Sequence, residues 1–318
     1  MSEMTNTPLR ILFMGTPDFA AATLQALLDG PDTVVAVVTQ PDRPKGRGKK
    51  LTPPPVKVLA QAAGIPVLQP TKIKTQEFRD ELAGYKPDVV VVTAYGRILP
   101  PALLELAPHG CINVHGSLLP AYRGAAPIQW AVINGDSETG VTIMQMDEGM
   151  DTGNILLTAA IPVNDDETAG SLFPKLAALG GTTVRQALAL LKEGKLTATV
   201  QDDTRATVAP MLKKEDGRID WQKSAREIHC LIRGLDPWPS AYCFLHGKRL
   251  QLFAPEVLHQ TSNVEPGTLL AADKRGLLIA TGRDCLLVRE VQPEGKKRMN
   301  VEAFLCGSPV EPGTRLFS

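Results

Sequence analysis

The chain has 318 residues, of which 43% are hydrophobic. A chain of this length and composition forms about two domains with packed cores, which excludes disordered, collagen-like and fibrous proteins. The 34 Lys and Arg residues balance the 34 Asp and Glu residues, so the formal net charge is +0. No overall field therefore attracts nucleic acid or membrane, and a polyanionic partner must be met by a local cationic patch.

The cysteines and the apolar segments indicate where the protein works. The five cysteines are odd in number and widely spaced, without a C-x-x-C pair, which argues against a disulfide framework and a zinc site. No segment approaches the ~18 apolar residues of a membrane span, and the N-terminus lacks the features of a signal peptide. We expect a cytoplasmic monomer that uses no metal and does not bind membranes.

Short β-branched runs alternate with amphipathic segments in the N-terminal part of the chain. Such runs are typical of parallel strands that are buried on both faces, and the segments between them are typical of crossover helices. The predicted strands cover residues 9–14, 34–39, 88–93, 111–115 and 139–146, and the predicted helices cover 19–28, 56–63, 76–83, 127–134 and 171–191. This pattern predicts an α/β domain with a doubly wound, mostly parallel, Rossmann-like sheet.

A basic loop follows the second predicted strand. Residues 41–50 contain five cations and one anion, and they leave the sheet at the end where doubly wound folds bind ligands. Two interpretations are open at this point: a solvated, mobile loop, or a finger that contacts the phosphates of a nucleic acid. The cations are Arg43, Lys45, Arg47, Lys49 and Lys50.

The pattern changes near residue 207. A short helix is predicted over residues 225–233, followed by strand-like runs at 241–245, 249–253, 276–280 and 285–291. Gly, Pro, Asn and Asp separate these runs at the spacing of a small barrel or sandwich. We therefore predict two domains, residues 1–206 and residues 207–318, of which the second is a small β-barrel similar to an OB fold.

The predicted strand 111–115 ends in a pair of polar residues. Asn113 and His115 are two positions apart, so their side chains leave the strand on the same face. The strand then breaks into a Gly-Ser-Leu-Leu-Pro loop, which places an amide and a titratable imidazole at the edge of the sheet. A lone histidine at a strand end is usually a surface residue, whereas the pairing with Asn113 favours a shared site.

A second polar segment follows the strand 139–146. It carries three acids within five residues, Asp147, Glu148 and Asp151, and it turns at Gly149 and Gly153. Asp151 suits a turn or a helix cap next to Thr152. It also suits a carboxylate that orients His115 and stabilises its protonated form.

An Asn, His and Asp set favours direct attack of an external amine on an activated acyl group. The amide and the imidazolium stabilise the developing oxyanion, and the His and Asp pair accepts the proton of the amine. Ser117 lacks the G-x-S-x-G elbow of an acyl-serine enzyme. The segment after the first strand has one glycine where dinucleotide binding needs three, so nicotinamide chemistry is disfavoured.

At these residues the sequence resembles the folate-dependent formyltransferases, and more closely the methionyl-tRNA formyltransferases among them. The matching motif comprises Asn113, His115, the segment 117–120 and Asp151, which follows His115 by 36 residues. The resemblance implies a site that takes a formyl group from 10-formyltetrahydrofolate. It implies that Asn113 and His115 polarise the formyl oxygen, and that Asp151 sets the state of His115 and assists with the proton.

The resemblance also implies a folate site that is built largely from main chain. The pterin is expected to lie against the segment after the strand 88–93 and against the turn before Asp151. The implied folate-binding residues are Ser117, Leu118, Leu119, Pro120, Arg97, Ile98, Leu99, Asp147, Glu148, Gly149 and Met150.

Three features point to initiator Met-tRNA as the acceptor. The segment 15–19, the basic loop 40–50 and the Asp-Pro-Trp-Pro signature at 236–239 resemble the enzymes that act on tRNA, and in them this loop reaches the acceptor stem. The barrel also carries basic clusters at 248–249, 274–275 and 296–298 that suit an RNA backbone. The alternatives are formylation of a small amine such as a nucleotide sugar or glycinamide ribonucleotide, hydrolysis of the folate, and a non-catalytic RNA-binding protein.

Overall fold

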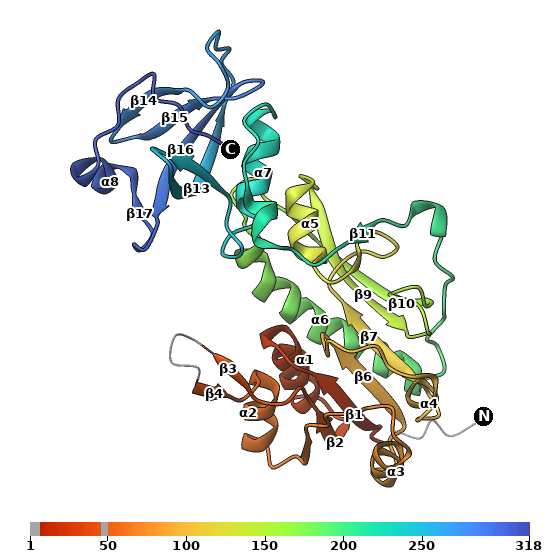
Figure 1. Ribbon diagram of the computed structural model, residues 1–318. Coiled ribbons are helices and arrows are strands. Elements are labelled where there is room, and N and C mark those ends of the chain that lie inside the picture. Colours follow the sequence, from red (N-terminus) through yellow and green to blue (C-terminus); the bar gives the residue numbers. More distant parts are fainter. Residues whose placement is uncertain (1–6, 46–49) are drawn as a thin grey trace. The chain divides into compact units, whose positions relative to one another are not determined.

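The computed structural model describes residues 7–45 and 50–318. The chain divides into two compact units, which interleave along the sequence (Figure 1). The first contains the residues up to Gly124 together with Thr139–Ile161 and Phe173–Val208, and the second contains Ala125–Glu138, Pro162–Leu172 and Ala209–Ser318.

The first unit is built on a mostly parallel sheet. The strand order is β10-β9-β7-β6-β1-β2-β5, so the chain starts in the middle and extends to both sides. Its strands are β1 (Arg10–Gly15), β2 (Thr33–Val38), β5 (Val67–Leu68), β6 (Val89–Thr93), β7 (Cys111–His115), β9 (Glu138–Gln145) and β10 (Ile155–Pro162). β1 pairs in parallel with β2 and β6, and β6 pairs in parallel with β7. The predicted doubly wound sheet is therefore confirmed.

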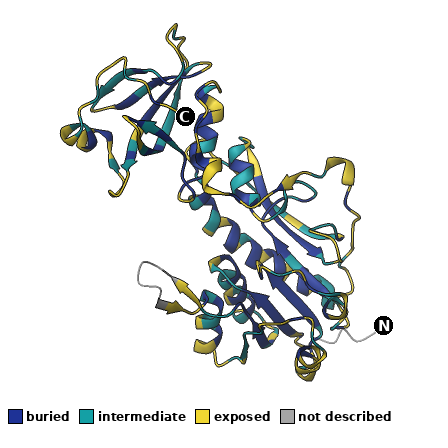
Figure 2. Ribbon diagram, in the orientation of Figure 1, coloured by how far each residue is buried: buried dark blue, intermediate teal, exposed yellow. Residues whose placement is uncertain are grey.

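Side chains on both faces of the central strands are buried, as the continuous apolar runs predict (Figure 2). On β1, Leu12 and Met14 join a core cluster with Phe78 and Leu103. The helices of this unit are α1 (Asp18–Leu28), α2 (Pro55–Ala62), α3 (Gln76–Gly84), α4 (Pro101–Leu104) and the larger part of α6 (Ala169–Lys192).

Two glycines let α6 approach its neighbours closely. A Cβ on Gly180 would lie 2.9 Å from a methyl group of Val114, and a Cβ on Gly181 would lie 2.6 Å from Ala26 of α1. Real Cβ atoms essentially never come within 3.0 Å of such neighbours. The close packing of α6 on β7 and α1 therefore requires glycine at both positions.

The edge of the first unit next to β7 differs from the parallel core. β9 runs antiparallel to β7, with Ile112 opposite Gln145 and His115 opposite Thr142. β10, which the sequence patterns did not predict, pairs with β9. Its residues alternate between half-buried and exposed, so it lacks the continuous apolar run that marks the inner strands.

The basic loop contains a β-hairpin. β3 (Arg43–Lys45) and β4 (Lys50–Thr52) pair antiparallel, with Arg43 opposite Thr52 and Lys45 opposite Lys50. Arg47 and Lys49, two of the predicted RNA-binding residues, lie outside the described residues. A hairpin base thus stands where the sequence patterns predicted a loop.

The second unit contains a curled antiparallel sheet of the OB-like kind, in the order β12-β13-β16-β15-β14. The predicted C-terminal barrel is therefore confirmed. Its strands are β12 (Tyr242–Leu245), β13 (Lys248–Leu258), β14 (Leu269–Asp273), β15 (Gly276–Ala280), β16 (Cys285–Pro293) and β17 (Met299–Asn300), and its helices are α5 (Pro127–Ile133), α7 (Ala225–Gly234) and α8 (Val301–Gly307). α7 packs on β13 and β16 and also on α5.

The last residues of the chain connect the two ends of this sheet. Phe244 of β12 and Phe317 exchange backbone hydrogen bonds of 2.7 and 2.9 Å. On the other side, Leu269 donates to the carbonyl of Thr314, and Leu316 donates to Gly267. Leu316 is buried in the barrel core. The segment 314–317 therefore lies between β12 and the start of β14 and closes the curled sheet.

Short pieces complete the chain. β8 (Arg123–Gly124) and β11 (Val208–Ala209) form a two-stranded sheet. One-turn helices cover Asp203–Arg205 and Lys214–Gly217. Among the described residues, no helix has both the length and the apolar character that a membrane crossing requires.

Candidate active site

β7 presents the two polar residues that the sequence singled out. Asn113 lies opposite Val92 of β6 on one side and Met144 of β9 on the other. His115 is the last residue of the strand. Because side chains alternate along a strand, Asn113 and His115 project from the same face. Asn113 is half-buried and His115 is 6% exposed.

Each ring nitrogen of His115 faces an oxygen. Nε2 lies 2.9 Å from the carbonyl oxygen of Tyr122, and Nδ1 lies 3.6 Å from Oδ2 of Asp151. A carbonyl oxygen only accepts, so Nε2 carries a hydrogen. The protonated ring presents an N–H to both oxygens, and the arrangement therefore suits an imidazole that holds a proton during a reaction.

Asp151 reaches His115 through a connection that folds back. Gln145, the last residue of β9, lies beside the beginning of β7, whereas His115 lies at its end. The connection from β9 to β10 must therefore return along the sheet. The Asp151 carboxylate then accepts a 2.8 Å hydrogen bond from the backbone N–H of Gly124. The predicted encounter of His115 with Asp151 is present in the structure.

The Ser117–Pro120 loop is held by one threonine of the neighbouring strand. The Thr142 hydroxyl donates to the carbonyl of Ser117 at 2.7 Å and accepts from the N–H of Leu119 at 3.0 Å. The Ser117 hydroxyl is fully buried and donates to the carbonyl of Ala121 at 2.6 Å. This serine is therefore placed to stabilise the loop and not to act as a nucleophile.

Cys111 is also unsuited to nucleophilic attack. It lies on the same face of β7 as Asn113, is fully buried, and its thiol donates to the carbonyl of Leu103. Burial raises the pKa of the Cys111 thiol to about 12. The thiolate, which is the reactive form, is therefore scarce near neutral pH.

The other predicted folate-binding residues lie in two segments. Arg97–Leu99 follow β6, where the Arg97 side chain donates to the carbonyl of Thr71, Ile98 is 81% exposed and Leu99 is buried in the core. In the turn 147–150, Asp147 accepts from Gly149 and Thr152, and Met150 is 63% exposed. Leu99 can therefore offer a ligand only its main chain.

Comparison with known proteins decides the family. The family model described as "Formyl transferase" matches residues 9–188, and "Formyl transferase, C-terminal domain" matches residues 211–309. The methionyl-tRNA formyltransferase of Desulfotalea psychrophila is 66% identical over 314 residues, which cover 99% of this chain and 97% of that protein. The chain belongs to the methionyl-tRNA formyltransferase family. The resemblance inferred from the sequence is thereby confirmed.

Further relatives agree with this membership of the methionyl-tRNA formyltransferase family. The methionyl-tRNA formyltransferase of Geobacter sulfurreducens is 52% identical over 308 residues, covering 97% of this chain and 96% of that protein. Among solved structures, the sugar 3N-formyl transferase WlaRD matches with a TM-score of 0.67 at 18% identity, covering 92% of this chain and all of that one. HypX from Aquifex aeolicus matches with a TM-score of 0.63 at 17% identity, covering 94% of this chain and 49% of that one. These two structures support the fold.

Asp42, the one acid of the basic loop, fixes the base of the hairpin in this member of the methionyl-tRNA formyltransferase family. Asp42 accepts from Gln69 at 2.7 Å and from Lys57 at 2.9 Å. The hydrogen bonds from Gln69 and Lys57 lower the pKa of Asp42 below its usual value. The adjacent Arg43 is exposed. Because Lys57 already neutralises Asp42, this acid does not offset the positive charge of Arg43.

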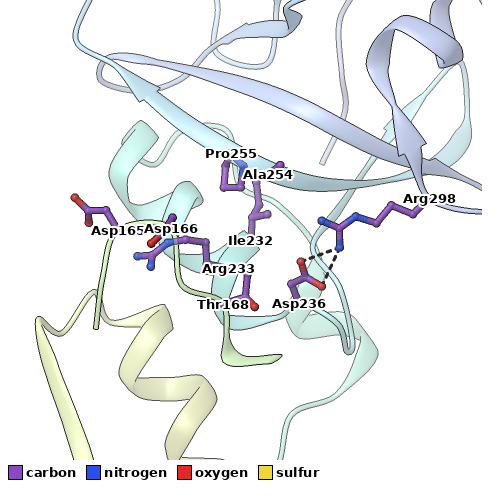
Figure 3. Close-up of a pocket in the computed structure, with 9 residues that line it drawn as sticks. All are labelled: Asp165, Asp166, Thr168, Ile232, Arg233, Asp236, Ala254, Pro255 and Arg298. Atoms are coloured by element: carbon purple, nitrogen blue, oxygen red, sulfur yellow. Dashed lines mark hydrogen bonds and ion pairs between the residues drawn. The ribbon is translucent and has the colours of Figure 1, made fainter. Parts of the chain in front are cut away.

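The second unit has a polar hollow of about 260 Å³ (Figure 3). Its lining includes Arg233, Asp236 and Arg298, together with Asp165 and Asp166. Arg298 is bound to Asp236 at 3.0 Å, and Arg233 donates to the carbonyls of residues 164 and 167. The two guanidinium groups therefore form hydrogen bonds and an ion pair within the second unit.

Several functional groups were not visible in the sequence. The carbonyl of Tyr122 contacts His115 and the N–H of Gly124 contacts Asp151 through the backbone, so no side-chain pattern marks them. Gln201 lies in a stretch without hydrophobic periodicity, yet it is 6% exposed and contacts the Asp151 segment. Among residues 7–45 and 50–318, no group of three or more His, Cys, Asp or Glu side chains could hold a metal ion.

Proposed function

We propose that this protein transfers the formyl group of 10-formyltetrahydrofolate to the α-amino group of methionine on initiator tRNA. The observation that carries the proposal is the near full-length identity of 66% to a protein named methionyl-tRNA formyltransferase. The local geometry supports it, because Asn113, His115 and Asp151 lie around the end of one strand. We also propose that residues 1–206 carry the chemistry and that residues 207–318 contribute RNA binding.

The residues fit a folate co-substrate, which supplies the formyl group. Ile98 and Met150, in the two segments assigned to the pterin, are among the most exposed large hydrophobic side chains. Both side chains are therefore accessible to a ligand. Main-chain groups of Arg97–Leu99 and of Asp147–Met150 would hold the polar edge of the ring. Ser117–Pro120, fixed through Thr142, would border the site.

In the proposed reaction, an amide bond forms between the methionine nitrogen and the formyl carbon, the bond from that carbon to the folate nitrogen breaks, and the proton that the amine loses is gained by the folate nitrogen. The Asn113 amide would donate a hydrogen bond to the formyl oxygen as negative charge develops there. His115 would stabilise the same charge and relay the proton. Asp151 would hold the ring in place and stabilise its cationic form.

An aromatic face on the barrel supports RNA as the partner. Tyr242 and Phe244 project from β12 on the side opposite to the buried Cys243 and Leu245, and Arg249 lies across from Phe244 on β13. The Arg249 guanidinium carbon lies 3.8 Å from the centroid of the Tyr242 ring. Phe317, 56% exposed, pairs with Phe244. Rings and guanidinium groups together are suited to stacked bases and phosphates.

Arg249 differs from the other arginines of the predicted basic clusters. Arg275 is paired with Asp273 at 2.7 Å, and Arg298 is paired with Asp236 and Glu290. In the part of the chain that the structure describes, Arg249 forms no ion pair; its Nε is buried without a hydrogen-bond partner, so the terminal nitrogens of its guanidinium are the groups left for a phosphate. We therefore propose Arg249, together with Arg43, Lys45, Arg47, Lys49 and Lys50, as the cations that contact RNA phosphates.

One assay separates this function from its alternatives. Purified protein is incubated with 10-formyltetrahydrofolate and, in parallel, charged initiator tRNA, an amino sugar nucleotide and glycinamide ribonucleotide. We expect formylation of the charged tRNA only. Formylation of the small amines without the tRNA, release of formate alone, or RNA binding without turnover would each contradict the proposal in a different way.

Two arginine substitutions test the RNA contacts. Arg47→Gln and Arg249→Gln should each raise the KM for charged tRNA and reduce the salt slope of tRNA binding by about 1, while the KM for the folate stays the same. Arg275→Gln is the matched control, because Asp273 already neutralises Arg275. If either variant kept the wild-type salt slope, that arginine would not contact a phosphate.

A further inference from the structure

Gln201 is a buried polar residue in a connection that the catalytic roles leave unexplained. It follows α6 by nine positions and belongs to the first unit, as do His115 and Asp151. Its side chain is 6% exposed, although its neighbours Val200 and Asp202 are exposed. A buried carboxamide is costly unless its hydrogen-bonding groups are satisfied, so its partners show what it does.

All the partners of the Gln201 carboxamide are accounted for in the structure. Nε2 donates to the carbonyl of Asp151 at 2.8 Å and to the carbonyl of Gly153 at 2.7 Å. Oε1 accepts from Nε and Nη2 of Arg123 at 3.1 and 2.8 Å. Carbonyls only accept and a guanidinium only donates, so chemistry fixes which end of the amide faces which segment.

The two segments joined by Gln201 are those that hold the catalytic pair. Residues 122–124 supply the carbonyl that binds His115 and the N–H that binds the Asp151 carboxylate. Residues 151–153 carry Asp151 itself. The amide of Gln201 lies between these segments: it donates to the backbone carbonyls of residues 151 and 153, and it accepts two hydrogen bonds from the guanidinium of the Arg123 side chain. A shift of one segment relative to the other would therefore break bonds to Gln201 and also change the distance from His115 to Asp151.

The backbone of Asp151 makes this support necessary. Its φ angle is +57°, in the left-handed region that residues with a side chain adopt at an energetic cost. The two bonds from Gln201 hold the carbonyls at residues 151 and 153, on the turn that contains this conformation. Without them the turn can relax, and the carboxylate moves with its backbone.

We propose that Gln201 is a positioning residue for the formyl transfer, which sets the separation of His115 and Asp151 by joining the backbone around Asp151 to the Arg123 side chain of the segment that holds both groups. This inference rests on the proposed function of that pair. It gives the connection after α6 a part in catalysis. This part is played by the amide of Gln201, which touches neither the formyl group nor the amine.

The test replaces Gln201 by an isosteric residue with the opposite hydrogen-bonding character. In Gln201→Glu, one carboxylate oxygen can still accept from Arg123. The other oxygen replaces the amide nitrogen, and it faces the carbonyls of Asp151 and Gly153 without a hydrogen to donate. We expect kcat for formylation of charged tRNA to fall about 10- to 100-fold, because small displacements of catalytic groups have effects of this size. The KM values for folate and tRNA should stay within about twofold, since uniform binding is preserved.

A double-mutant cycle distinguishes positioning from general stabilisation. If Gln201 acts through Asp151, the Gln201→Glu substitution should cost less than about twofold in residual turnover once Asp151→Asn is present. The pH profile of kcat should also shift in Gln201→Glu, as it depends on the pairing of His115. Additive losses in the cycle, or an unshifted profile with kcat near the wild-type value, would overturn the proposal.

Controls separate this proposal from the proposed function and from misfolding. Gln61→Glu makes the same substitution at an exposed position of α2 in the first unit and should leave kcat unchanged. Should Gln201→Glu fail to fold, Gln201→Met removes the donors without adding charge and should show the same loss of kcat at unchanged KM. If Asp151→Asn alone kept wild-type turnover, the catalytic pair would be wrong. If Asp151→Asn were inactive and both Gln201 variants were normal, only the role of Gln201 would be wrong.

Discussion

Two histidines in this chain are equally buried and have opposite surroundings. His115 is 6% exposed and His229 is 5% exposed. The ring of His115 faces the Tyr122 carbonyl and the Asp151 carboxylate. The ring of His229 instead accepts a 3.2 Å hydrogen bond at Nδ1 from the Arg233 guanidinium. Burial, with the positive charges of Arg233 and Arg226, lowers the pKa of His229 to about 4.

The difference shows that two histidines with similar exposed fractions can still differ in the hydrogen-bond partners that bear on what each ring can do. A ring surrounded by oxygen acceptors can gain a proton and keep its hydrogen bonds, which general acid and base catalysis requires. A ring that accepts from a guanidinium must stay neutral, because a second proton would remove its acceptor and add a charge next to a cation. His115 therefore suits proton transfer, and His229 suits a fixed structural contact.

The largest expected effect is that of His115→Ala. We expect formylation of charged tRNA to fall about 10³-fold, because the variant loses both proton transfer and stabilisation of the oxyanion. The midpoint of thermal unfolding should fall by only about 3 to 6 °C, because one buried ring is lost while the strands of the sheet keep their packing. Single-turnover formylation and circular dichroism give the two measurements. If the variant kept a tenth of wild-type turnover, the assignment of proton transfer to His115 and of a purely structural contact to His229 would be wrong.

Asp151→Asn removes the charge and keeps the shape. The amide oxygen can still accept from the N–H of Gly124, so the turn is expected to keep its place. Turnover should fall about 10²-fold, because the cationic form of His115 loses its carboxylate. The quantity to measure is kcat as a function of pH. A profile identical to that of the wild type would show that the carboxylate does not act through the ring.

His229→Gln should affect stability in acid and leave turnover at neutral pH unchanged. The pKa of His229 is about 4 in the folded chain and 6.5 without the fold. Between these values the unfolded chain binds more protons, so stability is complete above pH 6.5 and falls as the pH drops toward 4, by at most about 3 kcal/mol. The variant should lose this part of the decline. Thermal midpoints at pH 7 and pH 4.5 test it, and parallel declines in both proteins would contradict the assignment.

Arg226→Gln is expected to have the smallest effect, and it tests how much the Arg226 charge contributes to the lowered pKa of His229. Removing this cation should raise the pKa of His229 only part of the way, because burial is the largest cause of its lowering. The loss of the exposed ion pair with Asp165 contributes less than about 1 kcal/mol. Titration of the His229 ring by NMR measures the shift. An unchanged or lower pKa would contradict the contribution of the Arg226 charge to the lowering.

The sequence predicted the parts of the fold that depend on short-range patterns. The apolar runs over β1, β2 and β6 located the central strands, and the two-residue spacing of Asn113 and His115 placed both on one face. β10 and β14 were missed because their residues are mainly half-buried or exposed and lack a continuous apolar run. The interleaving of the units was also missed, because the packing of residues 125–138 and 162–172 with the second unit depends on contacts distant in sequence.

The candidate site shows the same limit. Asn113, His115 and Asp151 carry recognisable side chains, so motifs reveal them. The groups that fix their geometry are a carbonyl at Tyr122, an N–H at Gly124 and the amide of Gln201. Two of these are backbone atoms that every residue possesses, and the third acts from 50 residues away. Only the folded arrangement distinguishes them from their neighbours.

The closing segment 314–317 has a practical consequence for handling this protein. Its hydrogen bonds occupy backbone groups of Phe244, Leu269 and Gly267 that would otherwise lie along two open margins of the barrel. Unpaired strand margins recruit other chains and promote aggregation. A variant from which a carboxypeptidase has removed the segment 314–317 should therefore aggregate before it loses activity. For the same reason, a purification tag is better attached elsewhere than next to this segment.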